Sequence, residues 1–367
     1  MKKKKINTGK LIIFAVAALS ALGLVIFLMY LAFGKEEDVL SYTSMPIESG
    51  YAYDVSDHYL TYMTDNSLEQ VNLKDNSRTT TNIYAADGGF SVSSTMTAFY
   101  SGSDFQIRGY NAVSLTGTIR SVAAGSKYCA VLRTSNSSNL DSIVMFNASG
   151  QPVFDTIEFN DNKVISFGFD TADGRETLWV ICVNIESSTP ATTIHLYDFN
   201  NDGALTYYPV FYDQFIEQLA FTEDSVFIIG TQDIIRYSRT GSREQYRVGI
   251  YGKKVTDFRI GDGYVYFLLQ SRISDAEHTL FVQALAEADS PGTTSMSIYS
   301  GEKIVNAFLQ SGGIRVITPT RFLSYSYAGK LSKETELEYP ADNAVELDED
   351  RFLLVSDSDC YFVTIAS

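Results

Sequence analysis

The fold is decided by the stretch Phe221–Ile250, which reads FTEDSVFIIGTQDIIRYSRTGSREQYRVGI. An acidic turn at Glu223 and Asp224 precedes a short apolar run, and a second run, Asp233–Ser238, follows it. A turn that contains glycine then leads to a third run, Gln245–Ile250. Short runs rich in β-branched and aromatic residues, bounded by Gly, Asp and Ser, are typical of strands joined by hairpins. The stretch therefore predicts an antiparallel sheet made of consecutive strands.

The same unit recurs along the chain. Eight runs resemble Asp233–Ser238, and they begin at intervals of 37 to 51 residues, with a mean of about 42. Four-stranded propeller blades recur at about 40–45 residues. We therefore predict an all-β protein, a β-propeller of about eight four-stranded blades, with seven blades as the alternative. As the third strands of their blades, the runs begin at Ser67, Asp104, Asp141, Thr192, Asp233, His278, Arg321 and Asp359.

The two ends of the repeat region complement each other. The last unit, Asn343–Ser367, has room for only three strands, whereas Val39–Ile47 is a single strand-like run ahead of the first unit. A strand from the N-terminal end could complete the last blade and remove the exposed sheet edges of an open ring. We therefore predict that Val39–Ile47 closes the propeller.

Charge is distributed unevenly between the N-terminal segment and the rest of the chain. The net charge is −16, and the first 33 residues contain five lysines and no acidic residue. The remainder has 28 − 5 = 23 basic and 44 acidic residues, a net charge of −21. Such a surface repels phosphate backbones, so the composition argues against nucleic acid as a partner.

The N-terminal segment predicts a membrane anchor. Leu11–Phe33 contains 23 residues without a charge, which as a helix would be about 35 Å long and would span a bilayer. The alternative is a cleaved signal peptide, but its apolar core is normally shorter. The lysines of Met1–Lys10 place that tail in the cytoplasm. We therefore predict a single-pass protein of the cell membrane, with a stalk at Gly34–Asp38 and an extracytoplasmic propeller at residues 39–367. The simple tail and the lack of a disulfide framework favour a bacterial origin.

Three segments carry a resemblance to a known superfamily. Asp233–Gly241, Asp141–Gly150 and Arg321–Lys330 each contain an apolar strand, an aromatic residue and a short turn. They resemble the repeats of PQQ-like and WD40-like propellers. The tryptophans of quinone-dependent blades are absent, since Trp179 is the only tryptophan. The resemblance therefore implies the fold of a propeller domain, anchored here to a membrane, without quinone chemistry and without a specified function.

The residues with reactive side chains do not form a recognisable catalytic pattern. Cys129, Cys182 and Cys360 each lie within an apolar run, which predicts buried free thiols. The histidines His58 and His195, like the remaining one, belong to different units and lack the spacing of a zinc site. We expect them at solvent-facing strand edges. The sequence thus predicts no catalytic residue and no organic cofactor.

One segment matches the start of a calcium-binding loop. Asp198, Asn200 and Asp202 would place oxygen ligands at positions 1, 3 and 5, and Gly203 follows them. Position 12, normally a bidentate Glu, is Pro209. The same residues are ordinary in a tight hairpin turn, which is the preferred interpretation. A weak Ca²⁺ site at Asp198, Asn200 and Asp202 remains the alternative.

The loops between second and third strands favour a binding function. Polar loops of this class are Thr134–Leu140, Glu186–Ala191 and Ser271–Glu277. In a propeller they share one rim with the loops that join successive blades, and we expect the ligand there. The preferred hypothesis is a non-catalytic module that binds a protein or a cell-envelope polymer. Two alternatives are a carbohydrate-active enzyme that acts on the envelope through scattered carboxylates, and a ligand sensor that signals through a membrane partner.

Overall fold

The computed structural model describes most of the chain after the N-terminal segment. The described ranges are 38–47, 52–56, 58–83, 88–170, 176–184, 189–199, 204–207, 209–239, 243–275, 277–285, 295–299, 302–357 and 359–366. Within these ranges no helix is long and apolar enough to cross a membrane. The span predicted at Leu11–Phe33 lies outside them, as do the tail Met1–Lys10 and most of the stalk.

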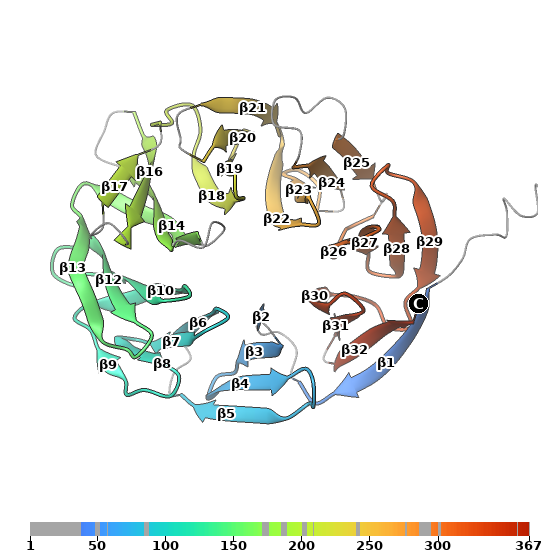
Figure 1. Ribbon diagram of the computed structural model, residues 1–367, viewed down its shortest axis with the longest axis horizontal. Helices are drawn as coiled ribbons and strands as arrows, with labels where there is room; N and C mark the ends of the chain where they lie inside the picture. The colour runs from blue at the N-terminus through green and yellow to red at the C-terminus, as the bar shows by residue number, and fades with distance from the viewer. Residues whose placement is uncertain are drawn as a thin grey trace, which may run out of the picture.

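Eight four-stranded antiparallel sheets are arranged as blades around a central axis (Figure 1). The first four blades are β2 (Tyr53–Ser56) to β5 (Arg78–Asn82), β6 (Gly88–Val92) to β9 (Val113–Ser114), β10 (Thr118–Ala124) to β13 (Pro152–Phe159), and β14 (Asn162–Asp170) to β17 (Ala204–Tyr207). Within them lie β3 (Tyr59–Met63), β4 (Ser67–Asn72), β7 (Thr97–Ser101), β8 (Asp104–Ile107), β11 (Tyr128–Thr134), β12 (Asp141–Asn147), β15 (Thr177–Asn184) and β16 (Ala191–Asp198).

The second half of the ring repeats this arrangement. Blades 5 to 7 are β18 (Ile216–Phe221) to β21 (Glu244–Gly249), β22 (Lys253–Gly261) to β25 (Ser295–Tyr299), and β26 (Asn306–Gln310) to β29 (Leu331–Glu336). Within them lie β19 (Ser225–Gly230), β20 (Asp233–Ser238), β23 (Tyr264–Ser271), β24 (His278–Ala284), β27 (Gly313–Ile317) and β28 (Arg321–Tyr325). Blade 8 contains β30 (Asn343–Asp348), β31 (Arg351–Ser356), β32 (Asp359–Ala366) and β1 (Val39–Met45). The prediction of eight blades is confirmed, and the alternative of seven is wrong.

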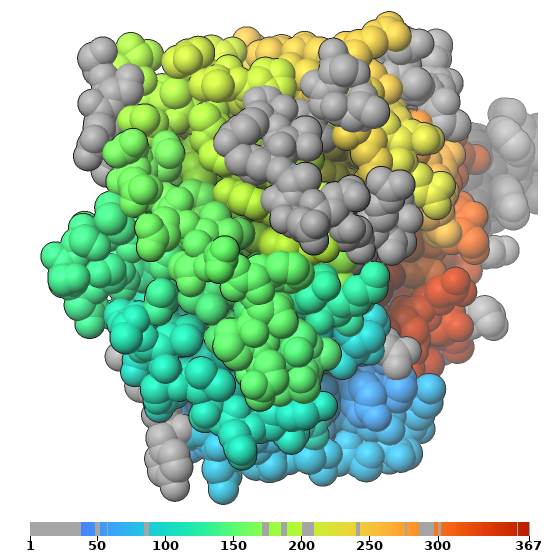
Figure 2. Space-filling view, turned by 60° about the vertical axis from the view of Figure 1, so that its left-hand side comes forward, coloured from blue at the N-terminus to red at the C-terminus, as the bar shows by residue number. Residues whose placement is uncertain are grey.

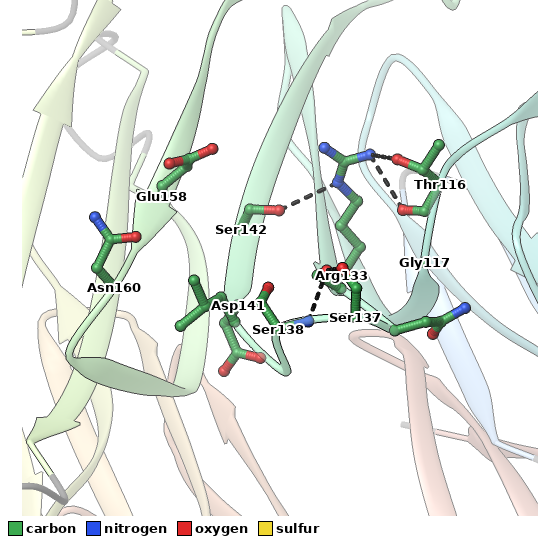
Figure 3. A pocket seen from close by; sticks show the side chains of 12 residues that line it. Thr116, Gly117, Arg133, Ser137, Ser138, Asp141, Ser142, Glu158 and Asn160 are labelled. Atoms are coloured by element: carbon green, nitrogen blue, oxygen red, sulfur yellow. Dashed lines mark hydrogen bonds between the residues drawn. The ribbon is translucent and has the colours of Figure 1, made fainter.

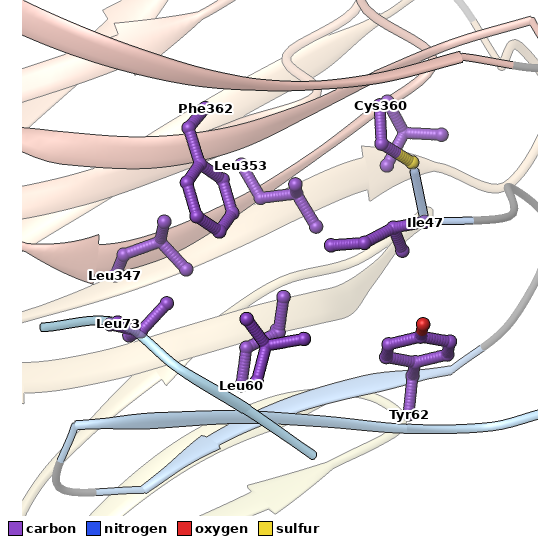
Figure 4. Packing of buried hydrophobic residues seen from close by; sticks show 10 residues of the cluster. Ile47, Leu60, Tyr62, Leu73, Leu347, Leu353, Cys360 and Phe362 are labelled. Atoms are coloured by element: carbon purple, nitrogen blue, oxygen red, sulfur yellow. The ribbon is translucent and has the colours of Figure 1, made fainter. Parts of the chain in front are cut away.

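The N-terminal strand closes the ring as predicted. β1 pairs antiparallel with β32, in a register that runs from Val39 opposite Ala366 to Met45 opposite Cys360. Behind this seam, side chains of blades 8 and 1 form one hydrophobic cluster (Figure 4). Ile47, immediately after β1, is buried in that cluster. Closure therefore combines main-chain pairing with side-chain packing.

The hydrophobic core is divided among the interfaces between blades. Eight buried clusters each join two neighbouring blades, and the blades follow one another in chain order around the wall (Figure 2). The second and third strands supply most of these side chains because both of their faces are covered. Cys129, Cys182 and Cys360 are buried and free, which confirms their predicted role. Trp179 is half-buried against the cluster between blades 4 and 5.

The prediction for the histidines is wrong. None of the three is exposed: His58 and His195 are half-buried, and His278 is buried. His278 Nε2 lies 3.0 Å from the carbonyl oxygen of Asp275, because the loop before β24 folds back over the strand. The side chain of His278, at the start of β24, is therefore in contact with the loop that precedes the strand.

Strand direction defines two faces of the ring. The loops between first and second strands and between third and fourth strands lie on one face, together with Asp38 ahead of β1. We call this the N-terminal face. The loops between second and third strands and between successive blades lie on the other face, which we call the distal face. The rim predicted to bind a ligand is the distal face.

Candidate functional site

A polar cavity of about 360 Å³ opens on the distal face at blade 3 (Figure 3). It lies at the loop Thr134–Leu140, one of the loops that the sequence singled out. Its lining is rich in hydroxyl and amide groups and includes one cation and one exposed anion. The lining residues are Thr116, Gly117, Arg133, Ser135, Asn136, Ser137, Ser138, Leu140, Asp141, Ser142, Glu158 and Asn160.

The floor of the cavity is fixed by the fully buried Asp141. One carboxylate oxygen accepts a hydrogen bond of 2.8 Å from Thr134 Oγ1, and the other accepts one of 3.0 Å from the backbone N–H of Val164 in blade 4. Arg120 and Lys163 form ion pairs with the carboxylate at 3.2 and 3.5 Å. A buried carboxylate needs such partners. Its charge is therefore compensated beneath the cavity and is not available to a ligand.

Arg133 is held in place by three acceptors. Its Nε donates to Ser142 Oγ at 3.1 Å, and its Nη1 donates to Thr116 Oγ1 at 2.7 Å and to the Thr116 carbonyl at 3.2 Å (Figure 3). Within the described ranges no carboxylate lies within 4 Å of this guanidinium, and Nη2 has no protein acceptor. The side chain is therefore oriented in advance and keeps donor capacity for a ligand.

Glycine allows the neighbouring loop to reach Arg133. Gly117 has a φ of +95°, and a Cβ at this position would collide with the carbonyl oxygen of Thr134. Only glycine adopts this backbone conformation without strain. The close approach of the two loops brings Thr116 to the guanidinium, so the sequence of the loop between blades 2 and 3 positions the cation of blade 3.

Three cavity residues form a row across the blade. Arg133 on β11 is directly opposite Ser142 on β12, and Ser142 is directly opposite Glu158 on β13. Neighbouring strands lie about 4.8 Å apart, so the Cβ atoms at the two ends of the row are separated by roughly 10 Å. Glu158 is exposed and, among the described residues, has no cation within 4 Å. The row thus presents a cation, a hydroxyl and an anion in sequence.

The distal face also has an apolar region, which we call the distal apolar patch. It comprises six side chains that are between 43% and 94% exposed, from loops or strand ends of blades 4 to 6: Val210, Tyr212, Phe215, Tyr251, Ile273 and Tyr299. Arg272 connects the loops that carry them, because it donates to the carbonyl oxygens of Lys253 at 3.0 Å and Thr231 at 3.4 Å. Thr231 in turn accepts from Phe215 N–H at 3.3 Å. Several exposed apolar side chains on loops that are linked in this way make this part of the face a candidate interaction surface.

Acidic side chains of three first strands lie near one arginine. Asp54 on β2, Asp257 on β22 and Glu346 on β30 come from first strands, which line the axis. Burial raises the pKa of Asp54 and of Glu346 above the ordinary range, and the Arg259 guanidinium offsets part of the rise. Gln310 Nε2 donates to Glu346 at 3.4 Å. These two groups, which we call the axial carboxyls, therefore take up protons more readily than exposed carboxyl groups.

The structure leaves the predicted calcium site untested. Asp198 is the last residue of β16, whereas Asn200 and Asp202 lie outside the described ranges. Among the residues that are described, no group of three or more His, Cys, Asp or Glu side chains could hold a metal ion. The turn interpretation and the Ca²⁺ alternative both stay predictions.

Comparisons with known proteins identify the fold. No protein-family model matches this chain, and no curated protein matches its sequence. Solved structures similar to it include the WD40 domain of SCAP from fission yeast, with a TM-score of 0.62, 9% identity, and coverage of 91% of this chain and 99% of that one. The dihydro-heme d1 dehydrogenase NirN gives a TM-score of 0.59 at 10% identity, covering 89% of this chain and 79% of its own. The C-terminal WD40 domain of Sif2 gives 0.58 at 11% identity, covering 90% and 100%. At such identities the likeness shows a propeller fold of this kind.

Sequence reasoning located the rim but named no residue on it. Arg133 and Glu158 are separated in the sequence and become neighbours of Ser142 only through the pairing register of three strands. One signal was available, because the run Ser135–Ser138 is unusually rich in small polar side chains for a loop that caps apolar strands. It indicates a hydrated surface, and it does not identify the cation beside it.

Proposed function

We propose that this protein is a membrane-tethered, non-catalytic interaction module outside the cytoplasm. The helix at Leu11–Phe33 would hold the propeller at the membrane, and the distal face would bind a protein or a cell-envelope polymer. The proposal needs no enzymatic step, in accordance with a sequence that lacks catalytic motifs.

One observation carries this proposal: the Arg133 cavity and the distal apolar patch lie on the face opposite the point where the chain enters the propeller. Asp38 precedes β1 on the N-terminal face, whereas the Arg133 cavity and the distal apolar patch lie on the distal face. An anchored propeller would therefore present both features away from the membrane. Propellers of the WD40 type, which this fold resembles, typically mediate protein interactions.

Affinity capture after crosslinking in cells tests the proposal. The full chain would be compared with a variant of the distal apolar patch, Tyr212→Ser, Tyr251→Ser and Tyr299→Ser combined. We expect one recurrent partner with the wild-type chain and its loss with the variant, because exposed aromatic side chains dominate binding energy at interfaces. Tyr110→Ser is the matched control, since Tyr110 is an exposed tyrosine of the N-terminal face. Capture of the same partner by Met1–Asp38 alone, or equal capture by the patch variant, would contradict the proposal.

A second candidate, an envelope-directed carbohydrate-active enzyme, is favoured by the axial carboxyls Asp54 and Glu346. A glycosidase needs a carboxyl group with a raised pKa as its general acid, and Asp54 and Glu346 have this property. Incubation of the full chain with isolated cell-envelope polysaccharide would reveal turnover. Turnover that is lost in Glu346→Gln and retained in Glu158→Gln would establish this candidate, whereas no turnover would remove it.

A further inference from the structure

We propose that the Arg133 cavity binds the C-terminal carboxylate of a peptide chain. This inference rests on the proposed function, because it names the chemical group by which a partner of the distal face is recognised. The site would take the last two or three residues of a peptide, within a volume of about 360 Å³.

The first argument is the state of Arg133. A guanidinium nitrogen donates a charge-assisted hydrogen bond to a carboxylate, and such bonds are stronger than those between neutral groups. Here Ser142 and Thr116 already accept from Nε and Nη1, which fixes the plane and leaves Nη2 for a ligand. Among the described residues Arg133 has no carboxylate partner, so no ion pair within the protein compensates its charge. Part of the entropic cost of ordering this side chain has thus been met before a ligand arrives.

The second argument limits the charge of the ligand. Glu158 stands at the other end of the row, and Asp141 below the cavity is neutralised by Arg120 and Lys163. A phosphate or sulfate dianion would meet one cation and one uncompensated anion. A single carboxylate next to a hydrogen-bond donor suits this pair better, because the donor can face Glu158 while the carboxylate faces Arg133.

The third argument identifies the ligand as a peptide. The roughly 10 Å between the ends of the row equals the length of about three extended residues. A peptide end supplies a carboxylate and, further along, backbone N–H groups for Glu158 and Asn160. Its carbonyl groups would meet the hydroxyls of Ser137 and Ser138. Leu140 is the only large aliphatic residue of the lining, so the cavity favours small terminal side chains.

Calorimetric titration of the full chain tests the inference with defined probes. The probes are N-acetyl-Ala-Ala-Ala as the free acid, the same tripeptide as its C-terminal amide, sodium glucuronate and inorganic phosphate. We expect the free acid to bind at least about tenfold more tightly than the amide, since a hydrogen bond to a charged group is worth about 1.5–3 kcal/mol. Equal binding of acid and amide would overturn the inference. If glucuronate bound more tightly than the free acid of the tripeptide, the inference would be overturned and the cavity would be assigned to an acidic sugar. Binding of phosphate that is tighter than that of the free acid would also overturn the inference.

Two variants test whether the free acid binds in the Arg133 cavity. Arg133→Gln should weaken binding of the free acid at least about tenfold, whereas Arg108→Gln on the N-terminal face should leave it unchanged. Because Arg133 also holds Thr116, a second variant keeps the arginine: Ser137→Trp, on the exposed loop tip, should block the cavity. Unchanged binding in a folded Arg133→Gln or in Ser137→Trp would contradict the inference. Neither result affects the capture experiment with the patch variant, so the two proposals fail separately.

Discussion

The side chain of Lys333 donates a hydrogen bond of 3.0 Å to the carboxylate of Asp38, the residue that immediately precedes the closing strand. Ser324 Oγ donates to the other carboxylate oxygen at 3.0 Å, and the backbone N–H of Asp38 donates to Thr335 Oγ1 at 2.9 Å. All three partners belong to blade 7, whereas β1 belongs to blade 8. Asp38 therefore fixes the start of β1 to the neighbouring blade.

Asp38→Ala should destabilise the propeller by about 1–3 kcal/mol, because it removes hydrogen bonds to a charged group and leaves Lys333 without its partner. Denaturant unfolding of the full chain would measure the change in the free energy of unfolding. Asp65→Ala is the control, since Asp65 is exposed. If Asp38→Ala lowered the free energy of unfolding no more than Asp65→Ala does, the hydrogen bonds of Asp38 to blade 7 would not stabilise the fold.

The closing strand itself gives a second prediction. Replacement of Val39–Met45 by seven Gly and Ser residues should lower Tm and promote dimerisation. The first effect follows from the loss of β1–β32 pairing, and the second from the exposure of the β32 edge. The same replacement in the exposed strand Arg78–Asn82 removes an outer strand without opening the ring. This control should lower Tm less than replacement of the closing strand does. An equal decrease in Tm for the two variants would show that ring closure by β1 stabilises the protein no more than any other outer strand does.

The strand pattern could be predicted from sequence because it depends on local signals. Seven of the eight predicted third strands begin at the predicted residue, and β16 begins at Ala191 instead of Thr192. The burial of His278 was mispredicted, because it depends on how the loop from Arg272 folds back. The Arg133 cavity was also missed because it depends on how separate segments of the chain come together. It forms only when the register of β11, β12 and β13 is fixed, and no local signal encodes that register.

The axial carboxyls Asp54 and Glu346 predict a dependence of stability on pH. Burial raises the pKa of Asp54 and Glu346 in the folded state, so the folded protein binds protons more readily than the unfolded one. Their contribution to stability is therefore present at low pH and is lost as pH rises from about 4, the ordinary carboxyl value, through the raised values.

Asp54→Asn combined with Glu346→Gln should consequently raise Tm relative to wild type at neutral pH, and the difference should shrink as pH falls. Tm measured across the acidic to neutral range would show this trend. A difference in Tm between the variant and the wild type that does not vary with pH would contradict the raised pKa values of Asp54 and Glu346. Glu158→Gln is the matched control, because it makes the same chemical change at an exposed position.

The cysteines predict a chemical probe of unfolding. Burial raises the pKa of the Cys182 thiol to about 12 and also raises the pKa of Cys129 and Cys360. The thiolate is the reactive form, so all three should resist iodoacetamide at neutral pH in the folded protein and react in concentrated urea. Mass spectrometry of the labelled chain would count the modified thiols. Rapid labelling of Cys129 under native conditions would mean that blade 3 opens readily.

Two buried carboxylates join blades 3 and 4 at opposite faces. On the distal face Asp141 of blade 3 accepts from Val164 N–H of blade 4. On the N-terminal face Glu176, ahead of β15 in blade 4, accepts from the backbone N–H groups of Lys127 and Tyr128 in blade 3, at 2.7 and 3.1 Å. Both are almost fully buried. The interface between these blades is therefore held by polar contacts at both ends of its hydrophobic cluster.

Glu176→Ala should destabilise the protein by about 2–4 kcal/mol, because two backbone N–H groups would lose hydrogen bonds to a buried charged acceptor. Gly125→Ala should have a similar effect although Glu176 itself is retained. A Cβ at Gly125 would collide with the Glu176 carboxylate and displace it from those donors. If both substitutions act by removing the Glu176 carboxylate from these N–H groups, the double variant should be little less stable than either single variant. Denaturant unfolding measures all three, with the exposed Glu277→Ala as control, and full additivity of the two losses would contradict the mechanism.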